Sequence, residues 1–328
     1  MRRHAASRSA RRTASAILIA IGVAVMTTPV AYGAPNLCGS KAGSPSAEYR
    51  HVVVIMDENK SFSDVIGPRG SAARRRAPFL NHVARTCGLA TNYRGITHPS
   101  HPNYMAITGG IPAIGSSEGP NIFRQLRRSG DTWRSYNPSM PHPCQRTAAY
   151  PYKPGHNPGI AWLRIAEDCR RWDVNGRALA RDIANHSLPT YAFIAPDQCH
   201  NMHASCNPRK GAVRAGDDWL RKWVRRLAQL PSYTAGRTVI FITWDEGSHG
   251  QSPDKRGEHC LAPVNRHDQS CHLATLVLSA HTRPGTRSHH SFSHYSLLHT
   301  AERLLGYHRY LGHADDPRTS GMSHAFGL

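Results

Sequence analysis

The sequence predicts an α/β fold in which a mostly parallel central β-sheet is sandwiched between helices. Two observations lead to this prediction: long apolar, β-branched runs, and helical periodicity in the segments between them. Such runs are typical of parallel strands buried on both faces, and alternating strands and helices favour a parallel sheet. The predicted strands cover residues 51–56, 190–194, 237–243 and 272–278.

Two segments have the spacing of amphipathic helices. Residues 217–227 place on one face the side chains of Trp219, Leu220, Trp223, Val224 and Leu227. Residues 295–305 repeat the pattern with Leu297, Leu298, Ala301, Leu304 and Leu305. Gly306 follows, in the position where glycine favours the end of a helix. The sequence therefore supplies helices to cover the predicted sheet.

Residues 111–158 are rich in Pro, Gly, Ser and Arg and have weak periodicity. A long segment of this kind inside an α/β domain is typical of a functional insertion. We expect a loop-rich insertion that walls the active site.

The N-terminus has the pattern of a signal peptide. Five arginines precede an apolar stretch at residues 14–26, and Ala31-Tyr32-Gly33 provides a small-x-small cleavage site. Arg11-Arg12 leaves open whether the export route is general or twin-arginine. We predict a signal peptide at residues 1–33 and a single secreted or envelope-located domain at residues 34–328, without a membrane span after processing.

All eight cysteines lie beyond the predicted signal peptide, and an even count in an exported chain favours disulfides over zinc. Their spacing suggests pairing in chain order: Cys38–Cys87, Cys144–Cys169, Cys199–Cys206 and Cys260–Cys271. Spacing alone leaves other connectivities open.

The net charge is +20, and removal of the five arginines in residues 1–33 leaves +15. Such a charge attracts anions of many kinds, including phosphorylated substrates and anionic envelope polymers. The basic run Arg74–Arg76 has no interleaved aromatic residues and is typical of a solvated loop, so no specific nucleic-acid partner is expected.

Acidic residues follow two of the predicted strands directly. Residues 51–56 run into Asp57-Glu58-Asn59, and residues 237–244 run into Asp245-Glu246. Ligands of parallel sheets gather outside the carboxyl ends of the strands, so these carboxylates are expected to meet in one crevice. Unpaired carboxylates repel one another, and a divalent cation between them removes the repulsion. The pattern predicts a metal-dependent enzyme.

A second motif, residues 97–110, places Ser100 just ahead of a short predicted helix at residues 103–108. A helix N-terminus offers free N–H groups to a phosphate, and a hydroxyl becomes a nucleophile when a metal or a base takes its proton. Ser100 is therefore the candidate nucleophile, and Asn103 is a candidate donor to a phosphoryl oxygen.

The three segments His51-Val-Val-Val-Ile-Met-Asp-Glu-Asn-Lys-Ser-Phe, His98-Pro-Ser-His-Pro-Asn-Tyr and Thr243-Trp-Asp-Glu-Gly, in this order, resemble the bacterial and fungal phosphoesterase family. That family contains secreted acid phosphatases and phosphatidylcholine-type phospholipases C, within the alkaline phosphatase superfamily. The resemblance spans roughly residues 50–306 and implies an alkaline-phosphatase-like fold.

The resemblance also implies a site. The metal would be surrounded by Glu58, Asn59, Ser100, Asp245 and Glu246. Ser100 would carry a transient phosphoseryl group, with Asn103 beside it. Residues 196–204 depart from the family motif Cys-Asn-Asp-x-His-Asp but retain its histidine as His203. We expect His203 to donate a hydrogen bond to the phosphate or to act as general acid. Because two acids of that motif are missing, we expect one divalent ion (Mg, Ca, Mn or Zn) rather than two. His294, in a late His-x-Ser segment, is expected to reach the crevice.

These expectations describe a phosphoric ester hydrolase, acid phosphatase-like, that acts as a monomer on a small phosphorylated substrate or a phospholipid headgroup. A phospholipase C-type diesterase on the same site is the first alternative. A sulfatase or a phosphonate hydrolase with the same fold is a further alternative. The segment Ser100-His-Pro-Asn-Tyr104, however, lacks the Arg of sulfatase motifs. A non-catalytic basic module would bind anions in a salt-sensitive way, without turnover.

Overall fold

A sheet of nine strands runs through the described residues of the computed structural model, in the order β4-β3-β5-β1-β6-β7-β2-β8, with β9 paired to β2. The structure describes residues 1, 37–43, 45, 48–165, 168–248 and 257–328. The predicted signal peptide lies outside these residues. The strands are β1 (His51–Asp57), β2 (Gly88–Arg94), β3 (Trp133–Asn137), β4 (Asp173–Asn175), β5 (Tyr191–Ile194), β6 (Thr238–Trp244), β7 (His272–Ser279), β8 (Arg287–Ser288) and β9 (Phe292–Ser293).

The centre of the sheet is parallel, as the apolar runs predict. Strand β1 lies between β5 and β6 and pairs in parallel with both. Residues 52–56 and 238–244 are buried. Side chains of both faces are thus covered, which explains why these strands read as continuous apolar runs instead of alternating ones.

Strand β7 runs antiparallel to β6 and to β2, whereas its apolar sequence predicts a strand of a parallel sheet. A parallel return requires a crossover, usually an α-helix, between the two strands. The described part of the β6–β7 connection holds only 3₁₀ turns, at His259–Leu261, Pro263–Asn265 and Gln269–Cys271. The chain therefore turns back at the edge of the sheet where β6 ends.

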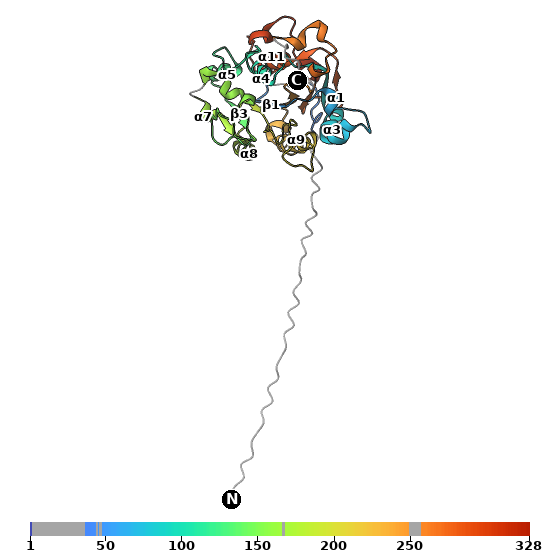
Figure 1. The fold of residues 1–328 in the computed structure, drawn as a ribbon. Coiled ribbons are helices and arrows are strands. Elements are labelled where there is room, and N and C mark those ends of the chain that lie inside the picture. The colour runs from blue at the N-terminus through green and yellow to red at the C-terminus, as the bar shows by residue number, and fades with distance from the viewer. Residues whose placement is uncertain (2–36, 44, 46–47, 166–167, 249–256) are drawn as a thin grey trace. The chain divides into compact units, whose positions relative to one another are not determined.

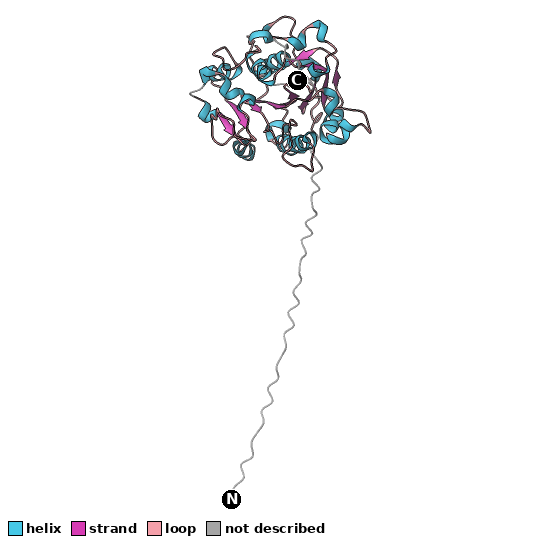
Figure 2. Cartoon of the chain, viewed as in Figure 1, coloured by secondary structure: helices cyan, strands magenta, loops and turns pink. Residues whose placement is uncertain are grey.

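Helices cover the sheet (Figure 2). They are α1 (Phe62–Val65), α2 (Ala72–Arg76), α3 (Pro78–Thr86), α4 (Ser100–Gly109), α5 (Ile122–Arg128), α6 (Pro158–Ala161), α7 (Cys169–Trp172), α8 (Gly176–Ala184), α9 (Ala212–Ala228), α10 (Pro231–Thr234), α11 (His294–Leu304) and α12 (Ser323–Phe326). Helix α11 packs on α4 and α9 packs on α3, and the two pairs lie to either side of β1 (Figure 1). None of the helices in the described part of the chain has the length and apolar character required to cross a membrane.

The predicted helices are present with shifted ends. Helix α9 begins five residues before the predicted segment 217–227, and it buries the predicted apolar face. Helix α11 is followed by Gly306 at φ 81°, the left-handed conformation that glycine adopts without strain. Arg74–Arg76 complete helix α2 rather than forming a loop, because the Ser71 side chain caps the helix by accepting from the Arg74 N–H at 3.2 Å.

The region 111–158 is more ordered than its composition suggests. It contains helix α5 and strand β3, and β3 pairs in parallel with β5 and β4. The short sequence of β3, Trp-Arg-Ser-Tyr-Asn, has no apolar run, and its pairing with β5 makes it a strand. The remaining loops of this region approach α4, as described below.

All four predicted disulfides are formed: Cys38–Cys87, Cys144–Cys169, Cys199–Cys206 and Cys260–Cys271. Each bridge joins two cysteines that are consecutive among the cysteines of the chain, so the loops that the bridges close are short or moderate in length. Cross-links of this kind stabilise a fold mainly by restricting the unfolded chain, typically by about 2–4 kcal/mol each.

A buried acid in α11 makes stability depend on pH. Glu302 is fully buried, and burial raises its pKa to about 8. A folded-state pKa above the unfolded value means that the folded chain holds this proton more tightly, so stability declines as pH rises from the unfolded pKa toward 8. Glu302→Gln should remove this slope. The variant is expected to gain up to about 4 kcal/mol over the parent between pH 5 and pH 8 in urea unfolding, at about 1.4 kcal/mol per pKa unit.

Glu118→Gln is the matched control, because Glu118 is mostly exposed and pairs with Arg164 on the surface. Its stability difference from the parent should stay constant over the same pH range. Parallel pH profiles for Glu302→Gln and the parent would show that the Glu302 carboxyl does not retain its proton on folding.

Candidate active site

The parallel pairing of β1 with β6 brings the two acidic motifs together. Asp57 is in register with Trp244, and the Asp245 N–H donates to the Asp57 carbonyl at 3.1 Å. Glu58 and Asp245 follow directly, and both are fully buried. The predicted convergence of carboxylates from different strands is therefore present at this edge of the sheet.

Asn59 connects the two motifs. Its backbone N–H donates to Asp245 Oδ1 at 3.0 Å, and its Nδ2 donates to Glu246 Oε1 at 2.5 Å. Asn59 has φ 36°, in the left-handed region that asparagine tolerates better than most residues. Its Oδ1 is buried and has no hydrogen-bond partner among the described residues, so this oxygen is available to a ligand.

Ser100 is the first residue of α4 and lies against the acids of both motifs. Its Oγ–H faces Glu246 Oε1 at 3.2 Å and Glu58 Oε2 at 3.4 Å. The nearby Ser100 hydroxyl also lowers the pKa of Asp245, against larger rises from burial and from the charge of Glu246. Three segments that are far apart in sequence thus meet at one hydroxyl.

Loops of the region 111–158 contact His101 and Glu58, which neighbour this hydroxyl. His101, the residue after Ser100, contacts the Gly115 carbonyl through Nε2 at 2.9 Å and the Gly155 carbonyl through Nδ1 at 3.1 Å. His156, one residue further, reaches Glu58 Oε1 through Nδ1 at 3.1 Å. The region predicted to wall the active site supplies a side chain to it.

Asn103 has a different environment from the one that its sequence position suggests. Its Oδ1 accepts from the N–H groups of Ile96 and Thr97 at 2.8 and 3.2 Å, and its Nδ2 donates to the carbonyls of Thr97 and Pro99 at 2.8 and 3.3 Å. Both ends of the amide are engaged by the loop before Ser100, so the structure gives Asn103 no free donor for a phosphoryl oxygen.

His294 lies behind the site rather than in the crevice. Its ring is fully buried, with Nε2 at 2.7 Å from the Asp245 carbonyl and Nδ1 at 3.0 Å from the Tyr93 hydroxyl. Burial lowers its pKa to about 4, so the ring is neutral near pH 7. Both ring nitrogens are occupied, and the side chain supports the backbone of Asp245.

His203 lies on the loop after β5, which ends at the same edge of the sheet. The Asn201 carbonyl on this loop accepts from the Glu58 N–H at 2.8 Å, which attaches the loop to the first acidic motif. The His203 side chain is exposed. Burial and the nearby Lys153 lower its pKa, while the charge of Glu246 opposes this shift. The His203 ring is thus close enough to Glu246 for the carboxylate charge to affect its pKa.

Sequence reasoning missed two contacts of Glu58. The Tyr104 hydroxyl donates to Glu58 Oε1, and the His156 ring stacks on Tyr104 with centroids 5.5 Å apart. Tyr104 stands in the Ser100 motif, four residues after Ser100, and this helical spacing is a usable signal. His156 carries no such signal, because it is one of 22 histidines and lies in a region of weak periodicity.

Tyr104→Phe should therefore weaken catalysis more than folding. The change removes one donor from a buried carboxylate, which costs about 1–3 kcal/mol where the acceptor is left unsatisfied. We expect kcat to fall by about tenfold and KM for p-nitrophenyl phosphate to stay within about twofold. Tyr136→Phe removes a buried hydroxyl that donates to Asp182, away from the site, and serves as the control. Equal kcat for Tyr104→Phe and the parent would contradict a catalytic role for this contact.

The acids of the site carry more negative charge than their surroundings compensate. Burial and the neighbouring Glu246 raise the pKa of Asp245 to about 7. Burial, and then the charge of Asp245, raise the pKa values of Glu58 and Asp57 well above their ordinary values. Among the described residues, Asp245 Oδ2 and both carboxylate oxygens of Asp57 are buried without a hydrogen-bond partner. Unpartnered oxygen donors of this kind suit a hard divalent cation.

Comparisons with known proteins identify the family of the chain. A model of the Phosphoesterase family matches residues 70–307. The phosphatidylinositol-3-phosphatase of Mycobacterium tuberculosis is 26% identical over 275 residues, which cover 81% of this chain and 80% of that protein. An acid phosphatase of Aspergillus fumigatus is 29% identical over 187 residues, covering 50% of this chain and 39% of the fungal protein. The chain thus spans well under half of that relative's length.

A solved structure supports the fold. A protein of the alkaline phosphatase superfamily from Vibrio parahaemolyticus superposes with a TM-score of 0.56 at 13% identity, over 86% of this chain and 74% of that one. At this identity the likeness concerns the fold alone, and it confirms the predicted alkaline-phosphatase-like architecture.

Proposed function

The chain belongs to the Phosphoesterase family and is a hydrolase of phosphoric esters, and on this premise we propose that it is a metal-dependent phosphatase with Ser100 as its nucleophile. One observation carries the proposal: the Ser100 Oγ lies within 3.4 Å of carboxylate oxygens from two separate strand ends. A hydroxyl among buried carboxylates is placed to lose its proton and attack phosphorus.

A divalent ion fits the donors around Ser100. Glu58, Asn59, Asp245 and Glu246 would hold it together with the serine oxygen, and the unpartnered oxygens of Asn59 and Asp245 support this assignment. When bound, such an ion lowers the pKa of a hydroxyl and neutralises charge on the transferred group. Oxygen donors admit Mg, Ca, Mn or Zn.

The residues of the chain have distinct tasks in this mechanism. Glu246 Oε1 accepts the hydrogen bond of Ser100, so the hydroxyl oxygen is oriented before attack. Ser100 passes its proton to Glu246 Oε1, attacks phosphorus in line and becomes phosphoserine, while the alcohol leaves with a proton from His203 or from water. Water then attacks phosphoserine, releases phosphate and restores the hydroxyl. Positioning and electrostatics supply most of the acceleration in such transfers.

The roles proposed for Asn103 and His294 differ from those that the sequence predicts. We propose that Asn103 and His294 are positioning residues: Asn103 holds the loop before Ser100, and His294 holds the backbone of Asp245. His203 remains the candidate general acid. Because its pKa is lowered, its protonated form is populated at acidic pH, which favours an acid optimum.

We propose that the chain acts outside the cytoplasm. Four disulfides in the described residues suit an oxidising compartment, and residues 1–33 have the pattern of a signal peptide. The name of the Mycobacterium relative makes a phosphorylated lipid headgroup a substrate to test beside small phosphomonoesters.

One set of assays tests this function. Hydrolysis is measured for p-nitrophenyl phosphate, its bis-ester and p-nitrophenyl phosphorylcholine, each with and without a chelator. A phosphatase cleaves the monoester best and loses this activity with the chelator. Preference for the phosphorylcholine ester would replace the proposal by a phospholipase C-type diesterase. Salt-sensitive binding without turnover of any substrate would reject a catalytic function.

A further inference from the structure

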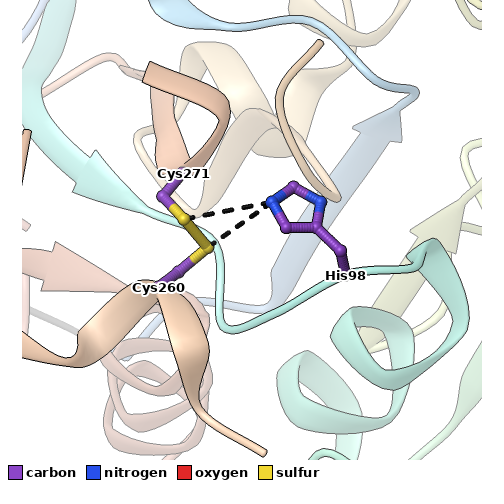
Figure 3. Close-up of side chains that lie close together, drawn as sticks. All are labelled: His98, Cys260 and Cys271. Atoms are coloured by element: carbon purple, nitrogen blue, oxygen red, sulfur yellow. Dashed lines mark hydrogen bonds between the residues drawn. A yellow bond between two sulfur atoms is a disulfide. The ribbon is translucent and has the colours of Figure 1, made fainter. Parts of the chain in front are cut away.

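His98 is buried between the active site and a disulfide. Its Nε2 lies 3.8 Å from Cys260 Sγ and 3.9 Å from Cys271 Sγ (Figure 3). A histidine between two sulfurs resembles a metal site, as does the overlapping group of His259, Asp268 and Cys271. The two cysteines are bonded to each other, however, so neither offers a thiolate. The group therefore needs another explanation.

The opposite nitrogen of the same ring contacts the catalytic acids. His98 Nδ1 lies 2.5 Å from Glu246 Oε2, and both side chains are at most 7% exposed. An ionised carboxylate only accepts, so the Nδ1–H of His98 donates to Glu246. The other oxygen, Oε1, faces Ser100 at 3.2 Å and Asn59 at 2.5 Å. The two oxygens of Glu246 are thus divided between His98 and the nucleophile.

The disulfide segment is bonded to both chain segments that carry this pair. On the His98 side, the Gly95 N–H donates to the Cys271 carbonyl at 3.1 Å and the Cys260 N–H donates to the Ile96 carbonyl at 2.9 Å. On the Glu246 side, the Gly247 N–H donates to the Ser270 carbonyl at 2.7 Å. A Cβ at Gly247 would lie 2.4 Å from that carbonyl oxygen, so the close approach requires glycine.

Ser270 completes the support of the ring. Its Oγ lies 3.1 Å from His98 Nε2, next to the bridged sulfurs. The imidazole is thereby held from behind by Ser270 and the Cys260–Cys271 bridge, and it points its other nitrogen at Glu246. Hydrogen-bond partners behind metal-binding side chains fix the orientation of those side chains and tune the affinity of the site.

We propose that His98 is a positioning residue: it fixes the Glu246 carboxylate so that Oε1 faces Ser100 and the proposed ion, and the Cys260–Cys271 bridge holds His98 in place. This inference deepens the proposed function and rests on it for the role of Glu246. It assigns to the disulfide a task in the site as well as in folding.

The test compares two variants of similar size. His98→Asn places its amide nitrogen near the position of imidazole Nδ1 and keeps a donor for Glu246, whereas His98→Gln places it near Nε2 and loses that donor. For His98→Gln we expect kcat with p-nitrophenyl phosphate to fall by about 10–100-fold, and Mn²⁺ affinity, measured by calorimetry, to weaken by about the same factor. KM should change by less than about threefold. His98→Asn should recover most of both losses.

His281→Asn is the control, because the His281 ring contacts the Gly43 carbonyl and follows the end of β7 that lies at the opposite edge of the sheet from the site. It should match the parent. Circular dichroism and thermal unfolding confirm the fold of each variant. If His98→Gln does not fold, Ser270→Ala replaces it, with an expected loss of several-fold in kcat and Mn²⁺ affinity.

Parental Mn²⁺ affinity and kcat in folded His98→Gln, or equal losses in His98→Asn and His98→Gln, would overturn the proposal. Mn²⁺ binding is read without turnover, so an error in the nucleophile assignment leaves this comparison intact.

Discussion

Ser100→Ala is expected to reduce kcat by about 10⁴-fold or more while the protein remains folded, which corresponds to at least about 5.5 kcal/mol in activation free energy. This change removes only the hydroxyl, which lies between Glu246 and Glu58. Loss of the proposed nucleophile removes the covalent step, whereas the carboxylates stay in place. The measurement is single-turnover and steady-state hydrolysis of p-nitrophenyl phosphate.

Two further observations decide the role of this serine. Acid quench of the parent during turnover should leave phosphate on the peptide that contains Ser100, detectable by mass spectrometry, and Ser100→Ala should lack it. Ser129→Ala, at an exposed position after helix α5, should behave as the parent. Activity of Ser100→Ala close to the parent's would identify another nucleophile, or direct attack by water.

Removal of the proposed divalent ion is expected to have the second largest effect. Without it, Glu58 and Asp245 are buried together with raised pKa values and no cation between them. We expect dialysis against a chelator to lower kcat by more than about 10³-fold, since metal ions supply several kcal/mol of charge stabilisation in such reactions. The midpoint of thermal unfolding should also fall, because loss of an ion present at about 1,000 times its Kd removes about 4 kcal/mol of stability.

Separate addition of Mg²⁺, Ca²⁺, Mn²⁺ and Zn²⁺ to the dialysed protein identifies the ion by recovery of both activity and thermal stability. A chelator presaturated with the activating ion is the control and should leave the parent unchanged. Full activity in a preparation with substoichiometric metal would show that the carboxylates act without an ion, and the mechanism would then rest on protonated acids.

The sequence predicts the centre of the fold because the physics there is local. Strands β1, β5 and β6 are apolar on both faces, and their parallel pairing brings Glu58 and Asp245 to one edge. The antiparallel direction of β7 could not be predicted, because it depends on the path of the β6–β7 connection and not on the residues of the strand. Strand β3 was missed because its pairing, and not its composition, makes it a strand.

The same distinction applies to the site. Glu58, Asn59, Ser100, Asp245 and Glu246 stand in contiguous motifs, and the structure brings them together. The environments of Asn103 and His294 depend on which backbone groups lie beside them, and sequence carries no direct record of that. His98 precedes Ser100 by two residues, yet its contact with Glu246 depends on a segment more than 160 residues away along the chain.

The bridge behind His98 has a practical consequence for anyone who prepares this enzyme. Protein made in a reducing cytosol would leave Cys260 and Cys271 as thiols, and the segment that supports the ring would lose its covalent tie. We expect such protein to be folded in its other parts and yet to hydrolyse substrate slowly. Expression in an oxidising compartment, and buffers free of dithiothreitol, are therefore conditions for measuring any of the rates discussed above.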